Sequence, residues 1–281
     1  MQTRRGFTLV ELLIVIVIIG LLAGITSVAF HGVRQSVKSS LISTEMSQLS
    51  MALDAYKNKF GEYPPDFSDQ AAVEKHLRKR WPRYNGSEDY PDPVIDFNVR
   101  IRTAWNLLPD SDLSYISSLV IWLGGLPSAD NPNKPGGFFL NPTDPFNSST
   151  GQREETFFDF DPKYIKTNVN GAPAFCLNEF PVIYFRAAYG SGYIGKSFVF
   201  DNDGDISYAV PYAKAYDQAK NIVQWYDEER FQLVHPGLDG SFGSNDPTIT
   251  RFVPTQTGVT SRDADNITNF VTSGTLESLY E

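Results

Sequence analysis

Cysteine and histidine are scarce in this chain of 281 residues, and their scarcity limits the chemistry available to it. The single cysteine, Cys176, excludes an intrachain disulfide and a cysteine-based zinc site, and is interpreted as a small buried hydrophobe. The three histidines, His31, His76 and His235, lie too far apart in sequence to form a metal-binding pair. Gly-rich phosphate loops of the Walker type and nucleophile elbows are also missing, so the sequence does not support an enzyme.

The chain also has no excess of positively charged residues. The chain has 24 Lys and Arg against 33 Asp and Glu, which gives a formal net charge of −9 and a pI of about 4.9. Nucleic-acid binders need a basic patch that displaces counterions from phosphates, so no nucleic-acid partner is expected. With 41% hydrophobic and 20% charged residues, the composition is typical of a folded protein rather than a disordered one.

One long apolar run lies near the N-terminus. Residues 1–6, MQTRRG, are short and basic, and residues 7–30 are apolar except for Glu11. As a helix, residues 7–30 would be about 36 Å long, which is enough to cross a hydrocarbon core of about 30 Å. Arg4 and Arg5 predict that the N-terminus stays in the cytoplasm while the rest of the chain is exported.

Three interpretations of this apolar run compete. A secretory signal peptide usually has an apolar core of about 7–15 residues and a small-residue cleavage site, whereas this run is longer and continues into a polar helix. A plain signal anchor explains the length and orientation but not Glu11, because a carboxylate in hydrocarbon costs a few kcal/mol. The third interpretation also accounts for Glu11 and rests on the details of the motif at the start of this run.

The segment RRGFTLVELLIVIVIIGLLAGI resembles the class III signal of type IV prepilins and type II secretion pseudopilins. Beyond the basic leader, the match covers five positions: Gly6, Phe7, Thr8, Leu9 and Glu11. The resemblance implies that a prepilin peptidase cleaves the chain between Gly6 and Phe7 and methylates the new amine of Phe7. Residues 1–6 would then be a leader that the mature protein lacks.

Glu11 has a physical role in this interpretation. In the family, the acid at this position pairs with the N-terminal amine of a neighbouring subunit. A lone carboxylate in an apolar environment is costly, and an ammonium partner removes much of that cost, so the pair would favour one axial register between subunits. The alternative is that the Glu11 carboxylate only reaches towards the membrane interface.

The apolar run continues into a predicted helix that reaches residue 60 and is about 80 Å long in all. Residues 7–30 would be its transmembrane half and residues 31–61 its amphipathic half. Apolar residues recur at helical spacing along one face of the second half: Val33, Val37, Leu41, Met46, Leu49, Leu53, Tyr56 and Phe60.

Glycine and proline mark two places along this helix. Gly20 and Gly24 either allow another helix to approach closely or weaken the helix locally, and the sequence leaves both possibilities open. The helix is predicted to end at Gly61, because Pro64 and Pro65 forbid its continuation. The passage YKNKFGEYPPDFSD resembles the end of the long helix in type II secretion pseudopilins.

Residues 62–281 are predicted to form a head outside the cytoplasm, with an insertion at about 70–175 relative to typical pseudopilins. A helix is predicted at 71–80, and passages such as NGSEDYPDP and NPTDPFNSSTG are interpreted as loops. Beyond Pro181, the segments PVIYFRAAY, SFVFDNDGDISYAV and FQLV predict a small antiparallel sheet. Its inner face should pack on the amphipathic half of the helix, so the predicted fold class is α+β.

An acidic loop with alternating aspartates, DNDGD, superficially resembles a calcium loop. It contains Asp201, Asp203 and Asp205, but Ile206 and Tyr212 stand where an EF-hand needs Gly and Glu. A hairpin turn on the Asp-Gly pair is therefore the favoured interpretation.

A second acidic loop, FQLVHPGLDGSFGSND followed by RDADNITNF, resembles the C-terminal loop of the secretion pseudopilins. In that family the loop holds one calcium ion through the Asp of Gly-x-Asp-Gly, an acid before the Ile and several backbone carbonyls. The resemblance implies Asp239 as one ligand. Asn266 precedes the Ile here, so Asp265 is the nearer substitute for the second ligand and Asp263 the next. A solvated acidic loop without a metal is the alternative.

These features predict a structural protein: a subunit of a type II secretion-like pseudopilus, similar to the major pseudopilin and held in the inner membrane by one span before assembly. The resemblance implies four kinds of partner, namely a prepilin peptidase and methyltransferase, identical or related pilin subunits, an inner-membrane assembly platform and membrane lipid. A type IV pilus subunit, major or minor, and a surface adhesin with a pilin anchor are the alternatives.

Overall fold

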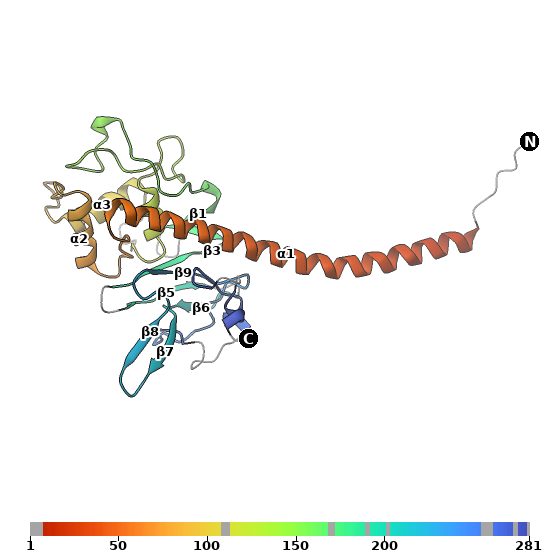
Figure 1. The fold of residues 1–281 in the computed structure, drawn as a ribbon. Helices are drawn as coiled ribbons and strands as arrows, with labels where there is room; N and C mark the ends of the chain where they lie inside the picture. Colours follow the sequence, from red (N-terminus) through yellow and green to blue (C-terminus); the bar gives the residue numbers. More distant parts are fainter. Residues whose placement is uncertain are drawn as a thin grey trace, which may run out of the picture.

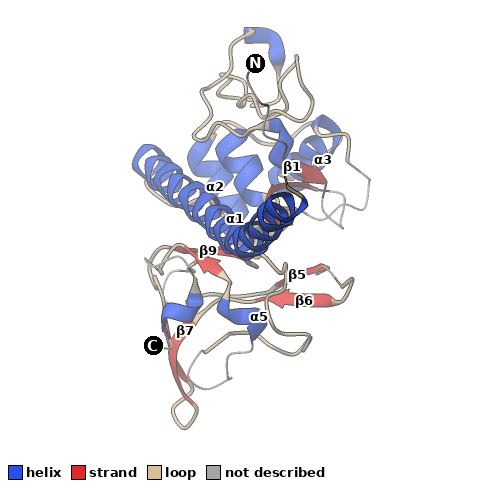
Figure 2. Ribbon diagram, turned by 90° about the vertical axis from the view of Figure 1, so that its right-hand side faces the viewer, coloured by secondary structure: helices blue, strands red, loops and turns tan. Residues whose placement is uncertain are grey.

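The computed structural model describes residues 8–107, 113–167, 172–188, 192–200, 203–253, 261–271 and 275–279, without the side chains of 25–32, 261–262 and 278–279. A long helix, α1 (Leu9–Phe60), projects from a head of short helices and small sheets (Figure 1). Its C-terminal part runs through the head, with α2, α3 and β1 on one side and β5, β6, β7 and β9 on the other (Figure 2). The predicted α+β fold class, with an N-terminal helix on small antiparallel sheets, is confirmed.

Local chemistry sets both ends of α1. Thr8 is the N-cap, and its hydroxyl accepts the backbone N–H of Glu11. Gly61 is the C-cap with φ of 77°, a left-handed conformation that glycine adopts without a Cβ clash, and its N–H donates to the carbonyl of Lys57 at 2.6 Å. The predicted end of the helix at Gly61 is therefore confirmed.

The first buried side chain among the described ones of α1 is that of Ile42. Val33, Val37 and Leu41, at the start of the predicted apolar face, are all more than half exposed. One face of the helix is buried in the head: Ile42, Met46, Leu49, Leu53 and Tyr56. The spacing of apolar residues identified the face of the helix, but it carried no information on where the head begins.

The segment at 70–175 is part of the head's main core. Helix α2 (Gln70–Arg80) agrees with the predicted helix at 71–80. Helix α3 (Pro93–Ala104) begins inside a passage interpreted as a loop, because Asp92 caps it and proline fits the first helical position. Trp122, in the π-helical turn η1 (Val120–Gly124), packs in the same apolar cluster as the buried face of α1.

The rest of the head consists of short elements. The 3-10 turns are η2 (Ser148–Thr150), η3 (Pro162–Tyr164) and η4 (Leu276–Leu279), and a short helix is α5 (Ser261–Ala264). The strands are β1 (Ile165–Thr167), β2 (Pro173–Leu177), β3 (Phe180–Pro181), β4 (Ile183–Arg186), β5 (Ser197–Phe200), β6 (Ile206–Ala209), β7 (Ala213–Asp217), β8 (Ile222–Trp225), β9 (Phe231–His235) and β10 (Ile267–Thr268).

The described strands form four small antiparallel sheets, where the sequence predicted one. Their strand orders are β1-β2-β3, β10-β9-β4, β5-β6 and β7-β8. The pair β5–β6 brackets DNDGD, which confirms the hairpin interpretation, although 201–202 lie outside the described residues. The short strands and frequent turns split the β-structure, so no single sheet covers the helix.

The β10-β9-β4 sheet lies between two apolar clusters. Tyr184 and Leu233 point to the cluster that includes α1, whereas Ile183, Phe185 and Val234 point to a second cluster under β5–β6 and β7–β8. Successive strand residues face opposite sides, so both faces of this sheet are buried. The sheet thereby joins the helix to the rest of the head.

Candidate functional site

The N-terminal part of α1 carries apolar side chains that the head does not cover. Twelve large apolar residues between Leu9 and Leu22 are each between 45% and 80% exposed. A search of the described residues finds no helix that meets the length and apolarity needed to cross a membrane. In the described chain, this half of α1 is an exposed apolar surface on a regular helix.

Glu11 lies at the start of this surface and closes the first turn of the helix. Its Oε2 accepts hydrogen bonds from the backbone N–H and the hydroxyl of Thr8, both at 2.8 Å, and its own N–H donates to that hydroxyl at 3.3 Å. This reciprocal pair is a capping box, and its negative charge is favourable at the N-terminal end of the helix dipole. Gly6 and Phe7, the predicted processing residues, lie outside the described residues.

The capping role of Glu11 was missed from the sequence. Its signal is present, because Thr8 and Glu11 have the Thr-x-x-Glu spacing of a capping box directly before an apolar run. The family resemblance drew attention to the charge of Glu11 instead. The structure places the carboxylate on the first turn of α1, where it is held by Thr8.

Gly20 and Gly24 have no packing role within the described chain. A Cβ built on either glycine meets no atom within 4 Å. Glycine costs about 1 kcal/mol relative to alanine in a helix interior, so these positions are weak points of the isolated helix. The second possibility from the sequence, close approach by another helix, requires a partner outside this chain.

A buried polar network joins the C-terminal end of α1 to α2. The hydroxyl of Tyr56 lies 2.6 Å from Nε2 of His76, and Nδ1 of His76 lies 2.9 Å from Oε1 of Glu62. Burial lowers the pKa of His76, so we assign a neutral ring that accepts from Tyr56 and donates to Glu62. The hydrogen bond from His76 in turn lowers the pKa of Glu62.

Arg80 extends this network to Glu154. Its Nη1 donates to the hydroxyl of Tyr56 at 3.0 Å, and its Nη2 donates to the carboxylate of Glu154. The Arg80 side chain is only 2% exposed, so its charge needs the Glu154 partner. The network therefore ties α1, α2 and the region around 154 together, a role that sequence reasoning did not assign to these residues.

The second acidic loop folds against two of its predicted calcium ligands. Oδ2 of Asp265 accepts the backbone N–H groups of Leu238 at 2.6 Å and Asp239 at 3.3 Å. A Cβ on Gly243 would come within 1.7 Å of Oδ1 of Asp263, so the loop backbone approaches this carboxylate closely. The structure thus brings Asp263 and Asp265 to the loop that contains Asp239.

The chemistry of this loop suits a hard cation. Burial raises the pKa of Asp265, and its Oδ1, like Oδ1 of Asn266, is buried without a hydrogen-bond partner among the described residues. Carboxylate and amide oxygens are the donors that calcium takes. However, within the described ranges no three His, Cys, Asp or Glu side chains gather into a metal-holding group. The calcium site at Asp239, Asp263 and Asp265 therefore stays a prediction.

Comparisons with known proteins match only part of the chain. Residues 1–27 match the family described as "Prokaryotic N-terminal methylation motif". The chain is 38% identical to "Type II secretion system core protein G" of Klebsiella pneumoniae over 64 residues, which are 23% of this chain and 46% of the relative. It is 36% identical to the protein of the same name from Klebsiella michiganensis over 63 residues, 22% and 44% of the two chains.

The chain spans less than half the length of these curated relatives. No solved structure matches it. The family model thus covers the first 27 residues, and each relative matches less than a quarter of this chain. Together, the methylation motif, the long N-terminal helix and the two relatives show that part of the chain is similar to a pseudopilin and support a pseudopilin-like protein.

Proposed function

We propose that this protein is a structural subunit of a type II secretion-like pseudopilus. A prepilin peptidase and methyltransferase would cut it between Gly6 and Phe7 and methylate Phe7. The apolar half of α1 would hold it in the inner membrane, with the head outside the cytoplasm, until an assembly platform moves it into the filament. The observation that carries this proposal is the prepilin motif at the start of a helix whose exposed apolar surface has no cover in the described chain.

In this proposal Glu11 has two roles. It holds the first turn of α1 through Thr8, and its charge pairs with the Phe7 amine of a neighbouring subunit. Apolar contacts alone would not fix the axial position of one subunit relative to the next, because dispersion and lipid exclusion favour no single register. A single ionic pair in an apolar environment favours one register, since every other register leaves a carboxylate and an ammonium unpaired.

Mass spectrometry of the N-terminus of the full chain tests the processing step. The expected product begins at Phe7 and carries one methyl group. An intact Met1, or cleavage well beyond Phe7, would contradict the proposal.

Two substitutions separate the roles of Glu11. Glu11→Gln keeps a side chain that can complete the capping box but removes the charge, whereas Glu11→Ala removes both. Both variants should insert into the membrane, and both should fail to form filaments. Normal filaments from Glu11→Gln would show that the charge has no part in assembly.

We also propose that the loop with Asp239, Asp263 and Asp265 takes one calcium ion. These carboxylates and the nearby Asn266 would be its oxygen ligands, and the bound charge would stabilise the loop. Thermal melting with and without a chelator tests this. A lower melting temperature in chelator is expected for the wild type but not for Asp265→Asn, and equal wild-type curves would count against the site.

A further inference from the structure

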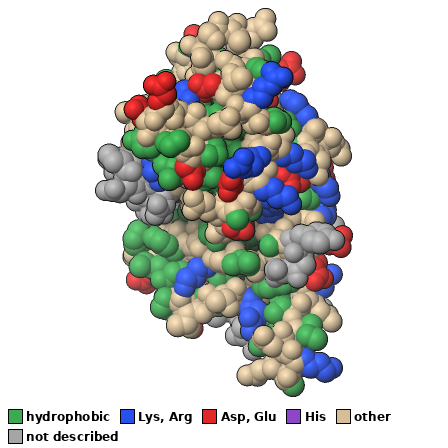
Figure 3. All heavy atoms as spheres, turned by 90° about the vertical axis from the view of Figure 1, so that its left-hand side faces the viewer, with side chains coloured by type: hydrophobic (Ala, Val, Ile, Leu, Met, Phe, Trp, Pro, Cys, Tyr) green, Lys and Arg blue, Asp and Glu red, His purple; other side chains and the backbone are tan. Residues whose placement is uncertain are grey.

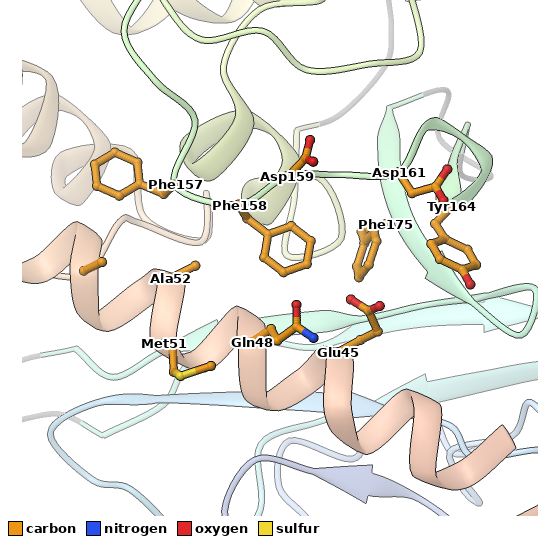
Figure 4. Close-up of a pocket in the computed structure, with 11 residues that line it drawn as sticks. Glu45, Gln48, Met51, Ala52, Phe157, Phe158, Asp159, Asp161, Tyr164 and Phe175 are labelled. Carbon is orange, nitrogen blue, oxygen red and sulfur yellow. The ribbon is translucent and has the colours of Figure 1, made fainter. Parts of the chain in front are cut away.

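A groove runs beside α1, between its residues 45–55 and the segment 157–164 of the insertion (Figure 4). It has a volume of about 430 Å³. The rings of Phe158 and Phe175 line its centre, and the side chain of Met51, 64% exposed, lies along the helix side. Segment 157–164 lies within the insertion predicted at about 70–175, so this groove would be a surface that the insertion creates.

The groove combines an apolar lining with one carboxylate that lacks a bound cation among the described residues. Asp159 pairs with Lys134 at 3.2 Å, and Asp161 pairs with Lys163 at 2.5 Å. Glu45 also lines the groove, and its carboxylate points into the space below Phe175 (Figure 4). Partial burial raises the pKa of Glu45, and the charge of Lys163, which pairs with Asp161, only partly offsets this effect. A further cation that reaches the Glu45 carboxylate would therefore stabilise it.

The residue types predict what fits such a groove. A Lys or Arg side chain has an apolar stem that can lie on aromatic rings and a charged tip that can reach a carboxylate. An anionic or purely apolar segment would leave Glu45 repelled or further desolvated without a partner. The occupant is therefore a segment that presents long cationic side chains.

The same chain carries such a segment on α2. Residues 57–83 contain seven Lys and Arg against four Asp and Glu, although the whole chain has a net charge of −9. Lys75, Arg78 and Lys79 stand three and four residues apart, so they form one exposed cationic stripe on the helix. Figure 3 shows Lys and Arg side chains gathered on this face of the head.

The cationic stripe on α2 cannot reach the groove of its own chain. His76 of α2 is fixed to Tyr56 by a buried hydrogen bond, whereas the groove is centred near Gln48 and Ala52, an earlier part of the same rigid helix. The two surfaces are thus offset along α1 by roughly 10 Å, at about 1.5 Å per residue. A second copy, displaced towards the N-terminal end of α1, can bring its α2 to the groove.

We propose that the Lys75–Arg78–Lys79 stripe of one copy docks into the Glu45 groove of the next copy along the filament. Two different surfaces meet in this contact, so it is heterologous and repeats without closing, which is the kind of contact that builds an open filament. The inference rests on the proposed function, since it needs copies stacked along α1. It gives the insertion a role: the inserted segment supplies one wall of a contact between subunits.

A zero-length carbodiimide cross-linker, which joins carboxylates to lysine amines, tests this contact. Full-length chains labelled with nitrogen-14 and nitrogen-15 are mixed in detergent micelles, cross-linked, digested and analysed by mass spectrometry. Peptides of mixed isotope that join Glu45 to Lys75 or Lys79 are expected. Glu45→Lys removes the carboxylate that the reagent activates, so it should abolish these links. Lys75→Glu should lower the yield of the remaining Glu45–Lys79 links about fivefold, the scale of an ion pair gaining about 1 kcal/mol.

The double variant Glu45→Lys with Lys75→Glu supplies the decisive comparison. It restores opposite charges between copies, so it should cross-link with itself through the same two positions but only weakly with the wild type. Asp217→Lys and Lys220→Glu reverse a similar pair on the β7–β8 turn and should leave the groove cross-links unchanged. Melting curves of every variant show whether the head is folded. If Glu45→Lys unfolds the head, Glu45→Gln replaces it as the variant without the Glu45 charge.

Three results would overturn the proposal. They are mixed-isotope links from Glu45 to lysines outside α2, links from Glu45 only to a different protein when cells are cross-linked, and a double variant that does not regain its links. The N-terminal mass measured on the same samples separates this contact from the proposed function. A chain that begins at methylated Phe7 but forms no α2 link would leave the pseudopilin proposal standing.

Discussion

The two halves of α1 belong to one unbroken helix but meet different surroundings. From Leu9 to Leu22 its large apolar side chains are exposed on all sides, and the head contributes nothing to this part. From Ile42 to Tyr56 one face is buried in the core, and the other face carries polar residues and the groove. The backbone is the same in both halves, so the distribution of apolar residues around the helix decides what each half contacts.

This difference separates two kinds of stability. The C-terminal half is stabilised by packing within its own chain, so it can be perturbed in an isolated molecule. The N-terminal half has no tertiary contact in the described chain, so packing energy must come from lipid or from other subunits. Mutations along one helix should therefore act on folding at one end and on membrane or filament contacts at the other.

The largest expected effect contrasts two leucines on α1. Leu53 is fully buried, so Leu53→Ala should lower the free energy of unfolding of the head by about 2–5 kcal/mol through lost burial and a cavity. Leu13 is 52% exposed outside the head, and Leu13→Ala should leave that value unchanged. Denaturant unfolding followed by tryptophan fluorescence measures both. Equal losses in the two variants would contradict the division of α1.

A pH titration probes the head without touching the N-terminal half. His235 is buried, and burial lowers its pKa from 6.5 to about 4, so the unfolded chain binds a proton at pH values where the folded head does not. The stability of the head should thus fall as pH drops from about 6.5 to 4, by up to about 3 kcal/mol. His235→Gln should flatten this dependence. The helical signal of a peptide comprising residues 7–30 in micelles should not follow it.

The glycines of the exposed half allow a smaller and opposite change. Gly20→Ala with Gly24→Ala should strengthen the helix by about 1 kcal/mol per site, because an added Cβ meets nothing within the described chain. Circular dichroism of the full chain in micelles measures the gain in helix, and the unfolding of the head should not change. Loss of filaments in this variant would show that another helix approaches closely at these glycines.

The smallest expected effect is at the first turn of α1. Thr8→Ala removes the hydroxyl from the capping box and should fray the helix start at a cost of about 1 kcal/mol. Hydrogen exchange of the amides at 10–12 measures this local effect, while Thr8→Ser should retain most of the protection. A change in the unfolding of the head would mean that the two halves are coupled.

Sequence reasoning worked best where one physical signal dominates. The helix ends at Gly61 because a glycine and two prolines act locally, and the β5–β6 hairpin forms around an Asp-Gly pair for the same reason. Sequence reasoning was less accurate where contacts between distant parts of the chain determine the structure. The apolar spacing placed Val33 and Val37 on one face with Met46 and Leu49, but no local rule states where a head begins to cover a helix.

The missed features are mostly long-range. Helix α3 had a local signal, Asp92 before Pro93, that the surrounding loop-like composition obscured. The link from Tyr56 through Arg80 to Glu154 had none, because its residues lie up to about a hundred positions apart and only the fold brings them together. The groove at Glu45 arises in the same way, from two segments that are distant in sequence.

The sheet between the two apolar clusters has a further consequence for the motions of the head. Strands β4 and β9 are buried on both faces, so exposing their amides to solvent requires both clusters to open at once. Local fluctuations that release one cluster leave the strand amides shielded by the other. The amides of Tyr184 and Val234 should thus exchange only through global unfolding, and their exchange rates would report the lifetime of the whole folded head.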